Sequence, residues 1–270
     1  MATLVSNGVR LRYIREGSGE PVVFLHGYLF GAAWWRPQID AIKDRFDTVA
    51  VDLRGQMQSE TTDDGYDLWN QAEDVHGLLQ QLGIAPAHVV GLSMGGMIAM
   101  RLAVSHPEDV RSLVLMDTSA RPEDPEKVER YEGMRQVVEA GNLEATLPAL
   151  PGIFLADDFI QANPATVEGW LGALRESNPL GLVRTSRAID SRDDISARLG
   201  EIQTPTPVIH ALEDVPIPME EAEVIERGIP GARLETVTGG HQSNVDRAED
   251  TCQLIRDFLE AVSGRSSAPA

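Results

Sequence analysis

Short runs rich in apolar residues alternate along the chain with longer segments in which apolar residues recur every three or four positions. The runs at residues 21–25, 48–52 and 111–117 are too short for helices and predict strands buried on both faces. The segment 67–82 has helical spacing and is followed by a glycine, a common end of a helix. Strands alternating with helices predict an α/β fold, with a mostly parallel sheet and helices on both faces.

The same alternation extends to both ends of the chain, with one interruption. An Asn-Gly pair at residues 7–8, between two apolar stretches, predicts a β-hairpin with a tight turn. Over residues 118–199 the spacing is helical throughout, and prolines divide the segment into short helices. Strands resume at 207–212 and 232–237, and a last helix is expected over 247–262.

This interruption predicts the domain organisation. Residues 1–117 and 200–262 are expected to form one α/β core, and residues 118–199 a helical cap inserted after the sixth strand. Ligands of open α/β sheets bind beyond the carboxyl ends of the strands, so we expect the cap to cover the site. The polar residues 263–270 are expected to form a flexible tail.

One junction between a strand and a helix has a chemical signature. An apolar run leads into Gly-Leu-Ser-Met-Gly at residues 91–95, and an apolar helical run leads out. Such a turn raises a serine hydroxyl above the end of the sheet, and glycines on either side avoid a collision inside it. The pattern therefore predicts that Ser93 is a nucleophile, and that Gly96 lets the following helix pack closely against the strand.

A serine hydroxyl needs a base that accepts its proton and a third group that orients the base. Asp214 follows the strand at 207–212, and His241 follows the strand at 232–237. Both are therefore expected at the same edge of the sheet as Ser93. The order serine, aspartate, histidine is typical of this turn. We predict that these three residues form a catalytic triad.

Other residues compete for two of these roles. For the acid, the alternatives to Asp214 are its neighbour Glu213 and Asp117, which ends the strand before the cap. For the base, only His241 has a Gly-Gly approach between a strand and the final helix. His76, His88 and His106 lie in a helical pattern or near segment starts and are expected to be structural or exposed. His210 lies within a strand and is expected to be a packed core residue, and His26 belongs to the loop after the strand at 21–25.

The oxyanion formed during acyl transfer needs two preorganised donors. The first is expected to be the backbone N–H of Met94, which begins the helix after the nucleophile and adds the attraction of the helix dipole. The second is expected in the loop after the strand at 21–25. There the N–H of Tyr28, in a His-Gly-Tyr sequence, is the best candidate.

Composition limits the class of partner. The chain has 42 acidic and 23 basic residues and a formal net charge of −19, which disfavours nucleic acid and anionic membranes as partners. No apolar window is long enough to span a membrane, and the first residues lack the pattern of a secretion signal. The single cysteine, Cys252, cannot form an internal disulfide, which fits a cytoplasmic location.

Together these motifs resemble the α/β-hydrolase superfamily over almost the whole chain. The matching segments are Phe-Leu-His-Gly at 24–27, Asp-Leu-Arg-Gly at 52–55, the serine turn, Asp214, and Gly-His at 240–241. The serine turn looks most like that of 3-oxoadipate enol-lactonases, bacterial carboxylesterases and cofactor-free haloperoxidase-type esterases. The resemblance implies an eight-stranded, mostly parallel sheet and a Ser-His-Asp acyl-enzyme mechanism without metal or organic cofactor.

Two positions depart from the superfamily's pattern. A glycine is usual where Met57 stands, and the methionine side chain is expected to alter this loop or narrow the floor of the site. A glutamate is common where Asp246 stands, shortly after the predicted histidine. Neither departure involves the predicted triad.

These inferences favour a serine hydrolase that acts on a small-molecule carboxylic ester or lactone. Hydrolysis of a carbon–carbon bond and perhydrolysis are alternatives on the same residues, and a ligand receptor on a hydrolase scaffold is a third. A lactone bearing a carboxylate would need a cation, for which Arg184 and Arg187 are the candidates. Apolar residues of the cap could line a pocket or pack onto the core: Leu147, Leu150, Ile153, Phe154, Leu155, Phe159, Ile160 and Trp170.

Overall fold

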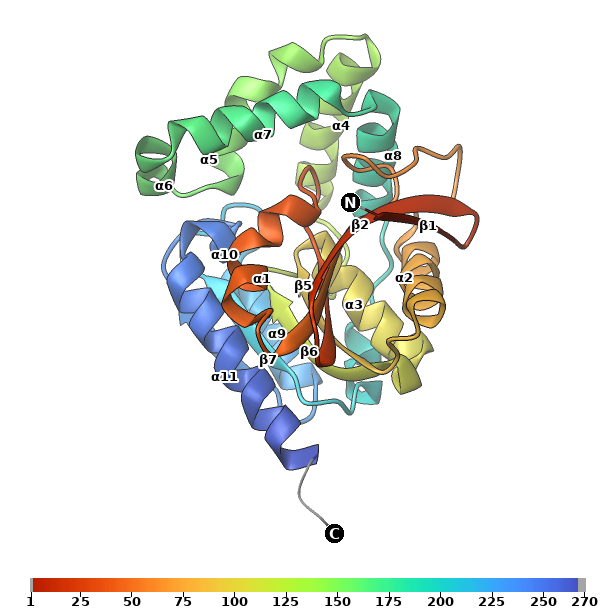
Figure 1. Ribbon diagram of the computed structural model, residues 1–270. Coiled ribbons are helices and arrows are strands. Elements are labelled where there is room, and N and C mark those ends of the chain that lie inside the picture. The colour runs from red at the N-terminus through yellow and green to blue at the C-terminus, as the bar shows by residue number, and fades with distance from the viewer. Residues whose placement is uncertain (1, 267–270) are drawn as a thin grey trace.

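The computed structural model describes residues 2–266, and an eight-stranded sheet forms its centre (Figure 1). The strand order is β1-β2-β4-β3-β5-β6-β7-β8; β2 pairs antiparallel with both of its neighbours, and the other five pairs are parallel. The predicted mostly parallel sheet is confirmed. The strands are β1 (Ala2–Ser6), β2 (Val9–Gly17), β3 (Glu20–Leu25), β4 (Phe46–Asp52), β5 (Ala87–Leu92), β6 (Val110–Met116), β7 (Pro207–Ala211) and β8 (Arg233–Val237).

Helices cover both faces of this sheet, because alternate residues of each strand point to opposite sides. In β3, for example, Val23 and Leu25 belong to one apolar cluster, whereas Val22 and Phe24 belong to another. The first cluster includes residues of α2, α3 and α9, and the second includes residues of α1 and α11. The helices of this core are α1 (Arg36–Ile42), α2 (Leu68–Leu82), α3 (Met94–Ser105), α9 (Met219–Gly228), α10 (Ser243–Asp246) and α11 (Ala248–Ser266).

Between β6 and β7 the chain forms five further α-helices, which lie together at one end of the molecule, coloured green in Figure 1. We refer to α4 to α8 as the inserted helices. Pro164 and Pro179 are the first residues of two of them, a position where proline's missing N–H costs no hydrogen bond. The inserted helices are α4 (Pro125–Glu139), α5 (Leu150–Phe154), α6 (Asp157–Ala162), α7 (Pro164–Glu176) and α8 (Pro179–Asp190).

An aromatic contact joins the inserted helices to the loop after β3. The Trp170 ring stacks on Phe30 with centroids 4.6 Å apart, and its indole N–H donates to the carbonyl of Leu29 at 2.9 Å. Trp170 therefore packs against the core, one of the two alternatives left open by the sequence. Short 3-10 helices complete the fold: η1 (Ala32–Trp35), η2 (Pro107–Asp109), η3 (Leu143–Ala145), η4 (Leu147–Ala149) and η5 (Ser196–Glu201).

The ends of the predicted elements differ in detail from those observed. Between β3 and β4 the chain forms two short consecutive helices, η1 and α1, with Pro37 in the first turn of α1. The last helix continues to Ser266, beyond its expected end at Val262, and residues 267–270 of the predicted tail lie outside the described residues. Within residues 2–266, no helix combines the length and apolar character needed to cross a membrane.

Candidate active site

Ser93 occupies the sharp turn between β5 and α3, at the carboxyl end of the parallel strands. Its φ of 54° and ψ of −119° place a non-glycine residue in a strained region of backbone space. Hydrogen bonds hold the turn: the N–H of Ser93 donates to Met116 O at 2.9 Å, and its carbonyl accepts from the hydroxyl of Thr118 at 2.7 Å. Strain of this kind, of order 1–3 kcal/mol, persists only where surrounding contacts impose it.

The glycines beside Ser93 are required by space. A Cβ on Gly91 would lie 2.5 Å from the carbonyl oxygen of Gly95, and one on Gly95 would lie 2.0 Å from that of Leu25. A Cβ on Gly96 would approach the Thr118 side chain to 2.7 Å. Each distance is below the van der Waals contact of the two atoms. The close approaches expected from the sequence are therefore present.

His241 and Asp214 lie in loops after β8 and β7 and are in direct contact. The Nδ1–H of His241 donates to Asp214 Oδ2 at 2.8 Å, and Asp214 Oδ1 accepts from the N–H of Ile217 at 2.8 Å. His241 is buried, which disfavours its charged form, but the attraction of Asp214 outweighs this effect and raises the pKa of His241. The arrangement orients the imidazole so that Nε2 is free to act as a base.

The two alternative acids do not make this contact. Asp117 is fully buried, and its carboxylate accepts from the N–H of Ala211 at 2.8 Å and from the hydroxyl of Ser243 at 2.5 Å. Burial, reinforced by the charge of Asp214, raises the pKa of Asp117 to about 8. Glu213 is an exposed residue. Of the three candidates, Asp214 makes the hydrogen bond to the imidazole.

Three other histidines have positions that explain their presence without catalysis. The Nε2 of buried His26 accepts from the N–H of Leu53 at 2.9 Å, which fixes the loop after β3. His88 is fully buried in β5 and contacts the hydroxyl of Ser112 at 2.7 Å. His210 is buried within β7, as expected for a packed core residue. The expectations for His88 and His210 agree with these positions.

The loop that contains Tyr28 lies directly beside the serine turn. A Cβ placed on Gly27 would lie 3.2 Å from the Cβ of Ser93, so the backbone at this point passes close to Ser93. On the other side of Ser93, Met94 is the first residue of α3, where backbone N–H groups have no partner within the helix. Both predicted oxyanion donors therefore belong to segments that adjoin Ser93.

A cavity of about 120 Å³ lies between the core and the inserted helices, and both Ser93 and His241 line it. The lining is mainly apolar, which suits the carbon skeleton of a small organic molecule. Its apolar side chains are Leu29, Met97, Met134, Val138, Leu143, Leu150, Ile153, Phe154, Leu174, Leu182, Val183, Ile189, Pro216 and Ile217. Its polar side chains are Tyr28, Ser93, Glu123, Tyr131, Arg135, Thr146, Ser186, Asp190 and His241.

Comparison with known proteins decides the family. Residues 20–248 match the family described as alpha/beta hydrolase fold. The chain belongs to the alpha/beta hydrolase family. A putative carbamate hydrolase, RutD of Azorhizobium caulinodans, is 31% identical to this hydrolase. The match covers 85% of this hydrolase and 87% of RutD.

Two solved structures share the architecture of this hydrolase. The enol-lactonase from Burkholderia xenovorans LB400 has a TM-score of 0.90 at 25% identity, covering 96% of this chain and 100% of its own. A thermophilic esterase from Thermogutta terrifontis has a TM-score of 0.89 at 25% identity, covering 97% and 98%. The relatives thus include proteins named for cleaving esters, lactones and carbamates.

The two arginines proposed from the sequence as cations for a substrate carboxylate do not line the cavity of this hydrolase. Arg184 donates to Thr62 O and forms an ion pair with the exposed Asp63 at 3.2 Å. Arg187 pairs with Glu139 at 2.7 Å and with Glu132 at 3.1 Å. Neither candidate guanidinium therefore lies at the site, and both pair with carboxylates outside the cavity. Arg135, which does line the cavity, was not singled out from the sequence, because a single arginine in a charged helix is typical of a solvated face.

Met57 is not among the residues that line the cavity, although it packs against the apolar cluster that includes Leu29 and Leu182. Of the two effects expected for it, a narrower floor of the site is therefore not observed. The φ of 47° at Met57 is the left-handed conformation that glycine adopts most readily, which agrees with the glycine expected at this position from the superfamily's pattern. Its side chain packs against Gly31, whose Cβ position would lie 2.6 Å from Met57 Cγ, and its sulfur is 3.9 Å from the hydroxyl of Ser177. The methionine joins two segments of the hydrolase that a glycine would leave apart.

Asp246 connects the histidine loop of the hydrolase to the inserted helices. Its Oδ2 accepts from the N–H of Gly240 at 3.0 Å, next to His241, and from the N–H of Ala156 at 2.8 Å, between α5 and α6. Burial raises the pKa of Asp246 to about 6. Because this value exceeds that of an unfolded aspartate, about 3.9, the protonated carboxyl stabilises the fold below about pH 4, and this contribution is lost as pH rises through 6.

Replacing Asp246 by alanine is expected to lower the free energy of unfolding by about 1–3 kcal/mol at pH 7. The reason is that the backbone N–H groups of Ala156 and Gly240, both buried, lose their acceptor. Denaturant unfolding measures the change. Asp158→Ala is the control, because its exposed ion pair with Arg247 should contribute less than about 0.5 kcal/mol. Equal stability of the two variants would contradict the anchoring role.

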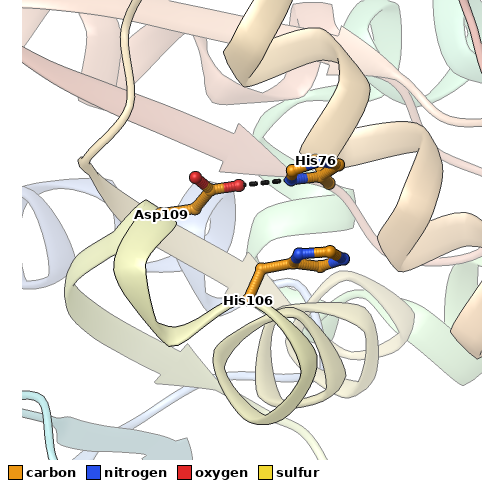
Figure 2. Close-up of side chains that lie close together, drawn as sticks. All are labelled: His76, His106 and Asp109. Carbon is orange, nitrogen blue, oxygen red and sulfur yellow. Dashed lines mark hydrogen bonds and ion pairs between the residues drawn. The ribbon is translucent and has the colours of Figure 1, made fainter.

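A second cluster of titratable residues, at a distance from the cavity, joins α2 to the turn after α3 (Figure 2). The rings of His76 and His106 stack 3.8 Å apart at 11°, while His76 Nδ1 bonds Asp109 at 2.6 Å and His106 Nε2 bonds Glu73 at 2.8 Å. A metal binds in the plane of an imidazole ring, so two nearly parallel rings do not direct nitrogens at one ion. The geometry is that of a structural contact in this hydrolase.

Proposed function

We propose that this hydrolase cleaves a small carboxylic ester or lactone through an acyl-enzyme formed on Ser93. The observation that supports the proposal most is the 2.8 Å hydrogen bond between Asp214 and His241, on the same cavity as the strained serine turn. A buried imidazole held by a carboxylate, on a cavity that a serine turn also lines, is the arrangement expected for activating a hydroxyl. The relatives named as esterase and enol-lactonase have the same fold and favour the same reaction.

In this mechanism His241 accepts the hydroxyl proton as the oxygen of Ser93 attacks the carbonyl carbon. The N–H groups of Met94 and Tyr28 hold the resulting oxyanion. Collapse of the intermediate breaks the bond to the alcohol, which leaves with the proton from His241. Water then attacks the acyl-enzyme, gives its proton to His241, and releases the acid as Ser93 recovers its hydrogen. Asp214 keeps Nδ1 protonated throughout.

The cavity supports a small substrate. Its volume of about 120 Å³ and mainly apolar lining suit a small organic molecule. We propose that the inserted helices act as the cap over it, because they supply a large part of its lining, including Arg135, Leu150 and Ser186. Carbamate hydrolysis is the second candidate, since the same nucleophile could attack a carbamate carbonyl and a relative is named for that activity.

A substrate panel combined with active-site labelling tests the proposal. We expect p-nitrophenyl acetate and butyrate to be hydrolysed faster than the decanoate, because the cavity is small. Small lactones and a p-nitrophenyl carbamate complete the panel and separate the two candidates. A fluorophosphonate probe should label Ser93 once in the folded protein, and Ser105→Ala, at the other end of α3, should leave this labelling intact. Absence of labelling would contradict the proposal and favour a ligand receptor.

A further inference from the structure

Four polar side chains form one part of the cavity wall. Arg135 comes from α4, Ser186 and Asp190 come from α8, and Tyr28 comes from the loop after β3. We refer to these four residues as the polar wall. They are the part of the lining that could select among substrates by charge and hydrogen bonding, because most of the remaining side chains are apolar.

The positive charge of the polar wall is already neutralised. Arg135 donates through Nη1 to the carboxylate of Asp190 and, at 2.8 Å, to the hydroxyl of Ser186. Its Nε donates to Glu132 at 2.8 Å, and its Nη2 lies 3.4 Å from the carbonyl of Val128. With every nitrogen of the guanidinium engaged, it offers no free pair of N–H groups to a substrate carboxylate.

The charges around the polar wall favour the same conclusion. Glu123 also lines the cavity and forms an ion pair with the buried Arg192 at 3.3 Å. Apart from the catalytic histidine, the lining therefore includes one cation, Arg135, and two carboxylates, Asp190 and Glu123. A substrate carboxylate at the polar wall would lose its hydration and would contact no positive charge that is not already paired. Binding of such a carboxylate is therefore unfavourable.

The hydroxyl groups of the polar wall suit a neutral partner. Burial raises the pKa of Tyr28 well above its usual range, against a smaller opposing effect of its hydrogen bond with Ser186, so the phenol keeps its proton. The hydroxyls of Tyr28 and Ser186 can each donate and accept a hydrogen bond, and the carboxylate of Asp190 can accept one. A primary amide or an alcohol, which also donates and accepts, is complementary to such a surface.

We propose that the substrate is uncharged and presents an amide or hydroxyl group to the polar wall, and that esters with a carboxylate at this place are rejected. This inference rests on the proposed ester hydrolysis. It differs from the carboxylate-bearing lactone that the sequence suggested, because the arginine at the cavity is committed to Asp190 and Glu132.

The test compares three aryl acetates that differ only at the para position. These are 4-carbamoylphenyl, 4-carboxyphenyl and 4-isopropylphenyl acetate, which place an amide, a carboxylate and an apolar group of similar size at the same distance from the ester. We expect kcat/KM for the amide to exceed that for the carboxylate by at least about tenfold, with the apolar ester between them. Hydrolysis is followed by acid release at constant pH.

Two variants connect this preference to the polar wall. Asp190→Asn removes one of the two carboxylate charges that pair with Arg135, the one that lines the cavity, and is expected to raise kcat/KM for the carboxylate ester by about tenfold. Ser186→Ala should lower kcat/KM for the amide ester severalfold relative to that for the apolar ester, because a hydrogen-bonding partner of the amide is lost. Asp63→Asn is the control, because Asp63 is a fully exposed carboxylate paired with Arg184, and should change neither value. Circular dichroism verifies that each variant is folded.

The wild-type ratio decides the inference even where a variant fails to fold. Hydrolysis of the carboxylate ester as fast as that of the amide would overturn it, and so would an unchanged ratio in folded Asp190→Asn. Failure of the proposed function would look different, because hydrolysis of all three esters would then persist in Ser93→Ala.

Discussion

Replacement of Ser93 by alanine is expected to reduce kcat for ester hydrolysis by between about 10³- and 10⁶-fold. Without the hydroxyl no acyl-enzyme forms, and the buried His241 can only activate water, which is not held in position for attack. The Michaelis constant should change little, because the apolar lining of the cavity and the polar wall remain. Steady-state rates with p-nitrophenyl butyrate measure the effect.

The substitution should leave the fold intact, since alanine and serine tolerate a φ of 54° about equally poorly and the turn is held by backbone contacts. Ser105→Ala is the matched control, a serine in the same helix whose hydroxyl bonds only to the carbonyl of Arg101 at 2.9 Å among the described residues. Activity near that of the wild type in Ser93→Ala would refute the assignment of the nucleophile. An equal loss in Ser105→Ala would point to damage of α3 instead.

The second largest effect is expected for Asp214→Asn, with kcat reduced about 10⁴-fold, as when the triad aspartate of serine proteases is replaced. An asparagine presents either an N–H or a neutral carbonyl to Nδ1, so the tautomer needed for catalysis is no longer favoured.

The pH dependence of the rate is also expected to differ between Asp214→Asn and the wild type. Burial disfavours the charged imidazole, but Asp214 outweighs it, so the pKa of His241 in the wild type lies above the ordinary value of about 6.5.

The sign of the pH effect follows from the role of the base. In the proposed mechanism His241 must be neutral to accept the proton of Ser93, so kcat/KM is expected to fall as pH decreases through its pKa. In the wild type this fall should occur above about pH 6.5, and in Asp214→Asn it should move to lower pH because the attraction that raised the pKa is gone. A pH–rate profile of both proteins measures the shift.

Asp117→Asn is the discriminating control for this pair. Burial and the charge of Asp214 raise the pKa of Asp117 to about 8, so near neutral pH it is largely protonated, and asparagine is a close substitute. We expect a loss of activity smaller than about tenfold. If Asp117→Asn lost as much activity as Asp214→Asn, the assignment of Asp214 as the acid that orients His241 would be contradicted.

The strands and the serine turn could be predicted because they depend on residues that are neighbours in the sequence. The apolar run before Ser93 and the glycines beside it are sufficient to specify a strand, a tight turn and a helix. Asp214 and His241 could be added because parallel strands end at the same edge of a sheet. The partnership of these two residues therefore followed from topology, without knowledge of any distance.

The positions of the inserted helices relative to the core could not be predicted, because helical spacing shows that a helix forms but not which surface it packs against. Arg135, Arg184 and Arg187 are the same residue type in similar surroundings along the chain, yet only the first has a buried side chain, with 5% of it exposed against 30% and 46%. The contacts that bury it, with Ser186 and Asp190, span more than 50 positions of sequence. Met57 could not be placed for the same reason, since its neighbour Ser177 belongs to a distant segment.

The single oxygen atom of Asp246 that holds both Gly240 and Ala156 has a consequence for substrate length. Because the loop of the base and the junction of α5 and α6 share one acceptor, a long acyl chain that pushes the inserted helices outward would pull on the loop that positions His241. Such a substrate would still bind, since the apolar lining would contact its chain. A longer chain would then lower the turnover number and leave the affinity nearly unchanged, so discrimination by length would appear in kcat more than in KM.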